Sequence, residues 1–131
     1  RRLVEALPAE QFVVFGTPAD AAIAAQVCAG FDPGRVANQA GRTSLVEFAA
    51  GLARCRLLVS NDTGGMHLAN ALGVPLIGLF GPTNPIRTGP VFASPSVVLQ
   101  PPGCPPTGGG SLGDLLPGQV VDAVGNLPSR A

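Results

Sequence analysis

The sequence predicts an α/β fold, a Rossmann-like parallel sheet with flanking helices, and two observations support this prediction. Short apolar runs at 57–59 and 75–80 have the composition of buried strands, the first of them buried on both faces, and the run at 12–15 reads as a compact strand. Stretches with helical spacing separate them, at 19–29, 43–54 and 66–72. Strands and helices alternate in this way in parallel sheets with crossover helices, and the crossovers are expected to be right-handed.

Composition and charge fit one globular domain and exclude several kinds of function. The 131 residues suffice for a domain with a core, and 46% are hydrophobic while only 12% are charged. Eight basic and eight acidic residues give a formal net charge of zero, so nothing in the charge favours a nucleic-acid partner. No apolar run approaches the roughly 20 residues that span a bilayer, and no signal peptide is visible.

The cysteines indicate neither a disulfide framework nor a metal site. Cys28, Cys55 and Cys104 are odd in number, far apart and without paired spacing. A reduced protein in the cytoplasm is therefore the simplest expectation.

The first half of the chain begins with the end of a helix at 1–7, closed by Pro8. A compact strand is expected at 12–15 and a short strand at 35–37, with a helix between them at 19–29. Thr43 or Ser44 caps the next helix, which runs to Arg54. Glu47 stands three residues after Ser44, which is the spacing of a capping box.

The second half has a strand–loop–helix–strand–turn order from 56 to 83. Gly73 is placed to end the helix at 66–72, and 81–83 turns the chain after the second strand. The stretch 84–95 reads as a Pro- and Gly-rich loop before a last strand at 96–99. We expect 101–117 to be irregular or poorly ordered, and 119–127 to form a closing helix that packs on the sheet.

The loop at 60–65 has the composition of a ligand site at the end of a strand. Asp62 or Thr63 can cap the following helix, and Gly64 and Gly65 let the backbone approach a ligand closely. Free N–H groups at a helix start favour a phosphate, and His67 in the first turn could face the same point. The alternative is that Asp62 and Thr63 only cap the helix and that His67 is a hydrogen-bonded helix residue.

Several segments together resemble the C-terminal domain of family-nine glycosyltransferases, the ADP-heptose:lipopolysaccharide heptosyltransferases. The most specific is VSNDTGGMHLANALGVPLIGLFGPTNPIRTGP, from Val59 to Pro90. Others are the strand and Gly-x-Pro-x-Asp turn at 12–20, the Gly-x-Thr-Ser-Leu element at 41–45, and the terminal helix around 120–124. The resemblance covers about residues 3–100 and 117–127, and it implies the C-terminal, donor-binding half of a GT-B fold.

The resemblance also implies roles for individual residues. Asp62, Thr63, Gly64, Gly65 and His67 would lie at the diphosphate and sugar end of ADP-heptose. A second group would surround the rest of the donor or line the cleft: Asp20 at the ribose hydroxyls, Thr43 and Ser44 beside the adenine, and Thr83 in the turn after the second strand.

Each of this second group has a structural alternative. Asp20 could be a charge at a helix N-terminus, Thr43 and Ser44 could be caps only, and Thr83 could belong to a plain turn. Arg87 is a candidate for an anionic partner, with a solvated loop arginine as its alternative.

The sequence departs from the family pattern in three places. The N-terminal acceptor domain is missing and, with it, the carboxylate expected as general base, so no catalytic residue is expected within this chain. The first strand of the C-terminal domain, with its phosphate-binding basic residue, is also missing. Only Cys104 remains of the cysteine-rich segment that often follows the last strand. We therefore expect residues 1–131 to be a single nucleotide-sugar-binding domain, as a fragment, with an irregular segment at 101–117.

The function implied is transfer of heptose, or a related sugar, from an ADP-sugar to a lipopolysaccharide-type acceptor without a metal or other cofactor. The expected partners are the nucleotide-sugar donor and, through the missing domain, a lipid-linked or saccharide acceptor. The location expected is the cytoplasm, peripheral at the inner membrane in the full-length protein. Two alternatives stay open: a non-catalytic remnant or nucleotide-binding module, and a GT-B transferase with a different nucleotide-sugar donor.

Overall fold

Every strand pair found in residues 1–128, the part of the chain that the computed structural model describes, is parallel. The chain divides after Phe48 into two compact units, which we describe separately. The first unit has a two-stranded sheet and the second a three-stranded sheet, each with helices against it. This confirms the predicted class, parallel sheets flanked by helices, although the hydrogen-bonded ladders form two sheets rather than one.

The first unit is built around the pair β1–β2, and α2 packs against β2. Two arginines tie α1 to its neighbours: the Arg1 guanidinium donates to the carbonyl of Ala29 at the end of α2, at 2.6 Å, and that of Arg35, next to β2, donates to the Val4 carbonyl. The elements are α1 (Arg2–Ala6), β1 (Phe12–Val14), the 3₁₀ turn η1 (Pro18–Asp20), α2 (Ala21–Cys28) and β2 (Val36–Asn38). Helix α3 (Leu45–Arg54) runs across the division into the second unit.

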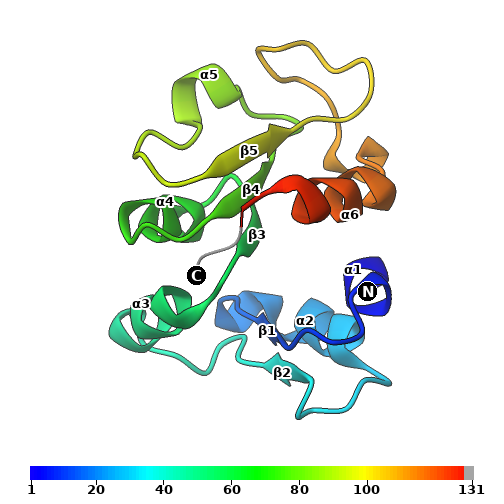
Figure 1. Cartoon of the computed structure of the whole chain (residues 1–131), viewed down its shortest axis with the longest axis vertical. Helices are drawn as coiled ribbons and strands as arrows, with labels where there is room; N and C mark the ends of the chain where they lie inside the picture. Colours follow the sequence, from blue (N-terminus) through cyan, green and yellow to red (C-terminus); the bar gives the residue numbers. More distant parts are fainter. Residues whose placement is uncertain (129–131) are drawn as a thin grey trace. The chain divides into compact units, whose positions relative to one another are not determined.

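The second unit has β4 in the centre of its sheet, between β3 and β5 (Figure 1). Helix α4 contacts β3 and β4, and the closing helix α6 contacts β4 and β5, so the predicted packing of the last helix on the sheet is confirmed. The elements are β3 (Leu58–Asn61), α4 (Gly64–Ala71), β4 (Leu76–Leu79), α5 (Pro85–Thr88), β5 (Ser96–Leu99), η2 (Leu112–Asp114) and α6 (Pro117–Asn126).

The register of the three strands brings their following loops to one edge. Asn61, the last residue of β3, pairs with Leu79, the last of β4, and Leu79 pairs with Leu99, the last of β5. The three strands therefore end level with one another. Ligands of open parallel sheets bind outside this carboxyl edge, which is where the candidate loop lies.

The core of the second unit lies between α4 and β4. Met66, Leu76 and Phe80 are fully buried in contact with one another, and Leu58 of β3 packs against them. Gly78 is required in β4, because a Cβ there would lie 2.9 Å from the Phe80 ring. The helix that carries the candidate loop is thus anchored by its Met66 side chain directly on the central strand.

The predicted strand bounds agree with the structure to within one or two residues, but three details were wrong. Helix α4 begins at Gly64 rather than Met66. The stretch 84–95, predicted as a loop, contains the helical turn α5. Strand β3, predicted to be buried on both faces, is only partly buried, because it lies at an edge of its sheet while β4 is the central strand.

The segment 101–117 contains η2 and the first residue of α6, is otherwise without regular secondary structure, and makes specific contacts. The amides of Gly109 and Gly110 both donate to the Gly81 carbonyl at 3.0 Å. Gly108 has a φ of +88° and sits so close to the Thr83 carbonyl that a Cβ would overlap it. The segment therefore rests on the turn after β4. No helix within residues 1–128 has the length and hydropathy needed to cross a membrane.

Candidate functional site

A shallow hollow marks the carboxyl edge of β3 and β4 in the second unit. It is lined by residues from the ends of the two strands, the loops that follow them, and η2: Asn61, Asp62, Leu79, Gly81, Pro82, Thr83 and Leu112. Its volume is about 80 Å³. A whole drug-sized ligand needs a cleft of roughly 300 Å³ or more, so this hollow could receive only one group of a larger molecule.

The loop between β3 and α4 leaves backbone donors at the helix start. Thr63 occupies the N-cap position, and its carbonyl accepts from the amides of Met66 at 3.1 Å and His67 at 3.4 Å. The amides of Gly64 and Gly65 precede these first helical bonds, so the helix itself offers them no acceptor. Together with the positive end of α4, they provide the donors that an anion needs.

Neither Asp62 nor Thr63 caps α4 with its side chain, so that prediction was wrong. The Thr63 hydroxyl instead lies 3.3 Å from the hydroxyl of Ser60. The Asp62 carboxylate is engaged by α5: its Oδ2 accepts a 2.7 Å hydrogen bond from the hydroxyl of Thr88. A contact from outside the loop thus replaces the local cap as the partner of Asp62.

The imidazole of His67 is partly exposed and faces the same carboxylate. Its Nε2 lies 3.7 Å from Asp62 Oδ1, which is an ion-pair distance when the ring is protonated but too long for a hydrogen bond. The His67 side chain is 41% exposed, whereas that of Asp62 is 15% exposed. The ring is therefore not part of the core, and its surface remains accessible to a ligand.

Thr83 lies in a turn that is fixed from behind. Gly81 is buried, and a Cβ on it would lie 2.7 Å from the Leu112 amide nitrogen. The thiol of Cys104 lies 3.7 Å from the Gly81 carbonyl, on the same segment. The turn therefore lines the hollow and packs against the 104–112 segment.

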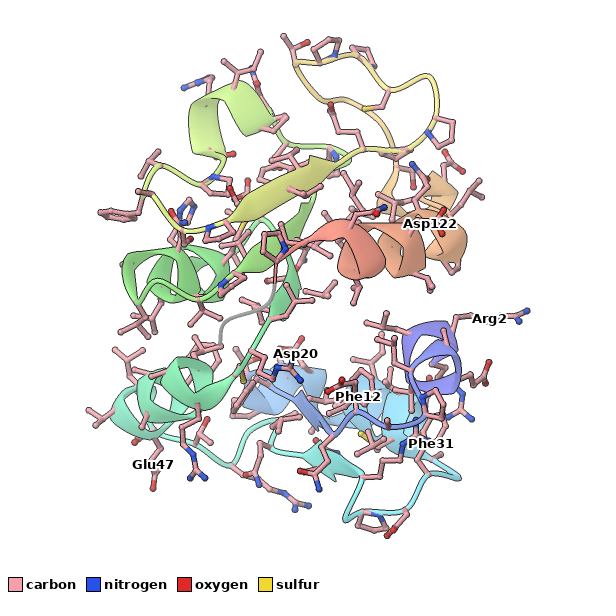
Figure 2. All side chains as sticks on the ribbon, in the orientation of Figure 1. Arg2, Phe12, Asp20, Phe31, Glu47 and Asp122 are labelled. Carbon is pink, nitrogen blue, oxygen red and sulfur yellow. The ribbon has the colours of Figure 1, made fainter. Side chains whose placement is uncertain are left out.

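Asp20, which Figure 2 labels in the first unit, is exposed, and its carboxylate accepts two hydrogen bonds. The amide and the hydroxyl of Thr17 donate to its Oδ2 at 2.7 and 2.8 Å. Both bonds lower the pKa of Asp20 below its usual value, and the bond from the hydroxyl has the larger effect. Asp20 ends η1 and directly precedes α2, so its charge stands at a helix N-terminus, while its second oxygen, Oδ1, lies outside this pair of bonds.

Ser44 and Glu47 form the predicted capping box at the start of α3. The Glu47 carboxylate accepts from the Ser44 amide at 2.7 Å, and the Ser44 hydroxyl accepts from the Glu47 amide at 3.2 Å. The bond from the Ser44 amide is the main cause that lowers the pKa of Glu47. Ser44, and not Thr43, is therefore the cap, and its side chain is engaged with Glu47.

The lowered pKa values of Asp20 and Glu47 predict that the stability of the protein depends on pH in the acid range. Since both folded-state pKa values lie below the unfolded ones, the stabilisation is present above the unfolded pKa and is lost as the pH falls through the folded one. We expect the urea midpoint to fall as the pH is lowered below about 5, less steeply in the double variant Asp20→Asn, Glu47→Gln. Equal slopes in the two proteins would contradict this attribution.

Within residues 1–128, no group of three or more His, Cys, Asp or Glu side chains is placed to hold a metal ion. Cys28, Cys55 and Cys104 are free thiols. Burial raises the pKa of the Cys55 thiol, which also donates to the Gly51 carbonyl at 3.3 Å. The expectation that no metal takes part remains a prediction.

Sequence reasoning missed three residues around the site: Thr88, Leu112 and Asn70. An Asn-Pro pair at 84–85 is a helix-start signal and could have indicated α5, which ends at Thr88. No sequence signal connects Thr88 to Asp62 or brings Leu112 to the hollow. Asn70 is buried and binds the loop after α5, although its position in the sequence looks like an ordinary helix residue.

Comparison with known proteins gives a family match over most of the chain. The model of the family described as glycosyltransferase family 9 (heptosyltransferase) matches residues 1–109. The chain is 32% identical over 131 aligned residues to lipopolysaccharide heptosyltransferase 2 of Salmonella typhimurium, covering 92% of this chain and 38% of that protein. It is 35% identical over 91 residues to lipopolysaccharide heptosyltransferase 2 of Escherichia coli, covering 67% and 26%.

Two solved structures share the fold. The structure of E. coli ADP-heptose lps heptosyltransferase II matches with a TM-score of 0.82 at 29% identity, covering 95% of this chain and 38% of that one. E. coli heptosyltransferase WaaC with ADP matches with a TM-score of 0.76 at 26% identity, covering 95% and 37%. The chain thus spans less than two fifths of the length of these relatives.

Proposed function

Because the chain belongs to glycosyltransferase family 9, we propose that residues 56–83 bind the diphosphate of a nucleotide-sugar donor. We propose an ADP-heptose, or a related ADP-sugar, as the donor and a lipopolysaccharide-type saccharide as the acceptor. The names of the relatives, which include ADP-heptose, lipopolysaccharide and ADP, support this choice.

One observation carries the proposal. At the start of α4, two glycine amides without a helical acceptor and the accessible imidazole of His67 occur within one turn. They stand beside Asp62, which lines the hollow at the carboxyl edge of the sheet. Preorganised N–H donors and an imidazole suit an oxyanion that gains charge during the reaction.

The reaction we propose is a displacement at the anomeric carbon of the sugar. The acceptor hydroxyl attacks this carbon, its bond forms as the bond to the β-phosphate oxygen breaks, and ADP leaves with the electron pair. The Gly64 and Gly65 amides and His67 would stabilise the leaving diphosphate more strongly in the transition state than in the ground state. The acceptor proton would pass to a carboxylate in the other half of the complete protein.

The remaining candidates would bind the nucleoside end of the donor or border the site. The free Oδ1 of Asp20 could accept the ribose hydroxyls, since charged acceptors make strong hydrogen bonds. The backbone at Thr43 and Ser44 would border the adenine, and Thr83 would contact the sugar end with Asp62. A cytoplasmic location, peripheral at the inner membrane, is the setting that we propose for the complete enzyme.

Calorimetry with ADP on the complete protein tests the proposal. We expect His67→Ala to weaken ADP binding about tenfold, the value of one charge-assisted hydrogen bond. UDP and GDP in the same assay test the base, because Asp20 would recognise the ribose only. Unchanged affinity and turnover in both His67→Ala and Asp62→Ala would remove this loop from the site, and preference for a uridine donor would overturn the ADP-heptose assignment.

A further inference from the structure

We infer that Thr88 is a positioning residue of the proposed donor site: its hydroxyl holds the Asp62 carboxylate in the orientation that faces His67. This inference rests on the proposed function. It concerns three side chains within the second unit, from α5, the β3–α4 loop and α4. Thr88 is 26 residues from Asp62 in sequence, so the contact is a product of the fold.

The hydroxyl of Thr88 has one proton and two acceptors within reach. Asp62 Oδ2 lies 2.7 Å from it and the Asn84 carbonyl 3.1 Å. A hydroxyl donates one hydrogen bond at a time, and bonds to a charged acceptor are shorter and stronger. The proton therefore belongs mainly to the carboxylate, and the bond to Asn84 is the secondary one.

The turn that presents Thr88 is fixed at its beginning. The Asn84 side chain accepts from the Ile86 amide at 2.9 Å, and Pro85 occupies the first helical position. At its end, the Gly89 amide donates to the Pro85 carbonyl at 2.8 Å, so close that a Cβ on Gly89 would overlap this carbonyl. Because both ends of the turn are fixed, few backbone conformations remain for Thr88.

The chain after the turn is fastened to α4 by a buried side chain. Asn70 is 1% exposed, and its Oδ1 accepts from the amides of Val91 at 3.0 Å and Phe92 at 2.7 Å. Its Nδ2 donates to the Ser94 hydroxyl. Since Asn70 stands on the same helix as His67, the segment that carries Thr88 is attached to the helix that carries the imidazole.

As a result, the two carboxylate oxygens of Asp62 face different partners. Oδ2 is held by Thr88, and Oδ1 is left 3.7 Å from His67 Nε2. Rotation about χ2 of an aspartate is broad and roughly two-fold, so a free carboxylate would not keep this arrangement. Thr88 acts through Asp62 on the ring, and it need not touch the donor.

A double-mutant cycle on ADP affinity in the complete protein tests the inference, with Thr88→Val, Thr88→Ser and Asp62→Ala. We expect Thr88→Val to weaken ADP binding about tenfold, whereas Thr88→Ser, which keeps the hydroxyl, restores most of the affinity. In the Asp62→Ala background, Thr88→Val should cause no further loss, because its partner is gone. Urea midpoints of all variants report whether the fold is intact.

The possible results separate the inference from the proposed function. Equal losses in the valine and serine variants, or a loss from Thr88→Val that persists without Asp62, would overturn the positioning role and leave the donor site standing. An unchanged affinity in Thr88→Val, combined with a loss in His67→Ala, would do the same. Full affinity in both Asp62→Ala and His67→Ala would instead overturn the proposed function itself.

Discussion

Replacing Gly64 by leucine is expected to lower ADP affinity and turnover about 100-fold while leaving the fold intact. Gly64 is the first residue of α4, and a Cβ built on it meets no atom within 4 Å. The fold therefore has room for the side chain, and leucine is a better helix former than glycine by up to about 1 kcal/mol. In our proposal the space beside Gly64 belongs to the diphosphate, so the leucine would exclude it. Calorimetry with ADP and the rate of sugar transfer measure the loss.

Gly118 provides a matched control for this substitution. It is the second residue of α6, and a Cβ on it also meets no atom within 4 Å. Gly118→Leu should thus change neither ADP binding nor turnover, and both variants should keep the urea midpoint of the parent. If Gly64→Leu binds ADP as the parent does, the donor phosphates do not approach this turn and the proposed site is wrong.

The elements of the fold were largely predictable because they depend on local patterns. Strand β4 is a continuous apolar run in the centre of its sheet, and its predicted bounds are close to Leu76–Leu79. The Ser44–Glu47 capping box depends on residues three apart, and the structure confirms it. Gly73, placed to end α4, has a φ of +72°, the left-handed conformation that suits glycine after a helix. In each case the deciding contacts lie within one helical turn or one strand.

The location of the candidate site could be predicted from the sequence, but most of the hydrogen bonds made by its side chains could not. The register of β3, β4 and β5 follows from a parallel sheet, and it places the loop at the expected edge. The cap at Thr63 was wrong because its hydroxyl pairs with Ser60 and because Asp62 has a partner in α5. The contacts of Asp62 with Thr88 and of Asn70 with the 91–94 loop join residues more than 20 positions apart. No periodicity or cap signal encodes such pairs, since they depend on tertiary packing.

Replacing Phe80 by alanine is expected to lower the free energy of unfolding by about 3–5 kcal/mol. The Phe80 ring is fully buried at the end of β4, in contact with Met66 and Leu76. The ring lies against Gly78, where a Cβ would be only 2.9 Å away. Since Gly78 has no side chain that could move into the space, the cavity left by alanine would be filled only in part. Since whole domains are stable by only about 5–15 kcal/mol, this single change should remove a large part of the stability. Urea unfolding of the complete protein, followed by circular dichroism, measures the effect.

The control for this prediction makes the same chemical change at an exposed ring. Phe92 is 55% exposed, and its backbone amide, rather than its side chain, makes the hydrogen bond to Asn70. Phe92→Ala should therefore change the free energy of unfolding by no more than about 0.5 kcal/mol. Similar losses in the two variants would mean that the Phe80 cluster is not the core of the second unit. A large loss of stability in Phe80→Ala alone would show that the contact between β4 and Met66 holds α4 on the sheet. Because His67 follows Met66 in that helix, the same contact would hold the donor loop in place.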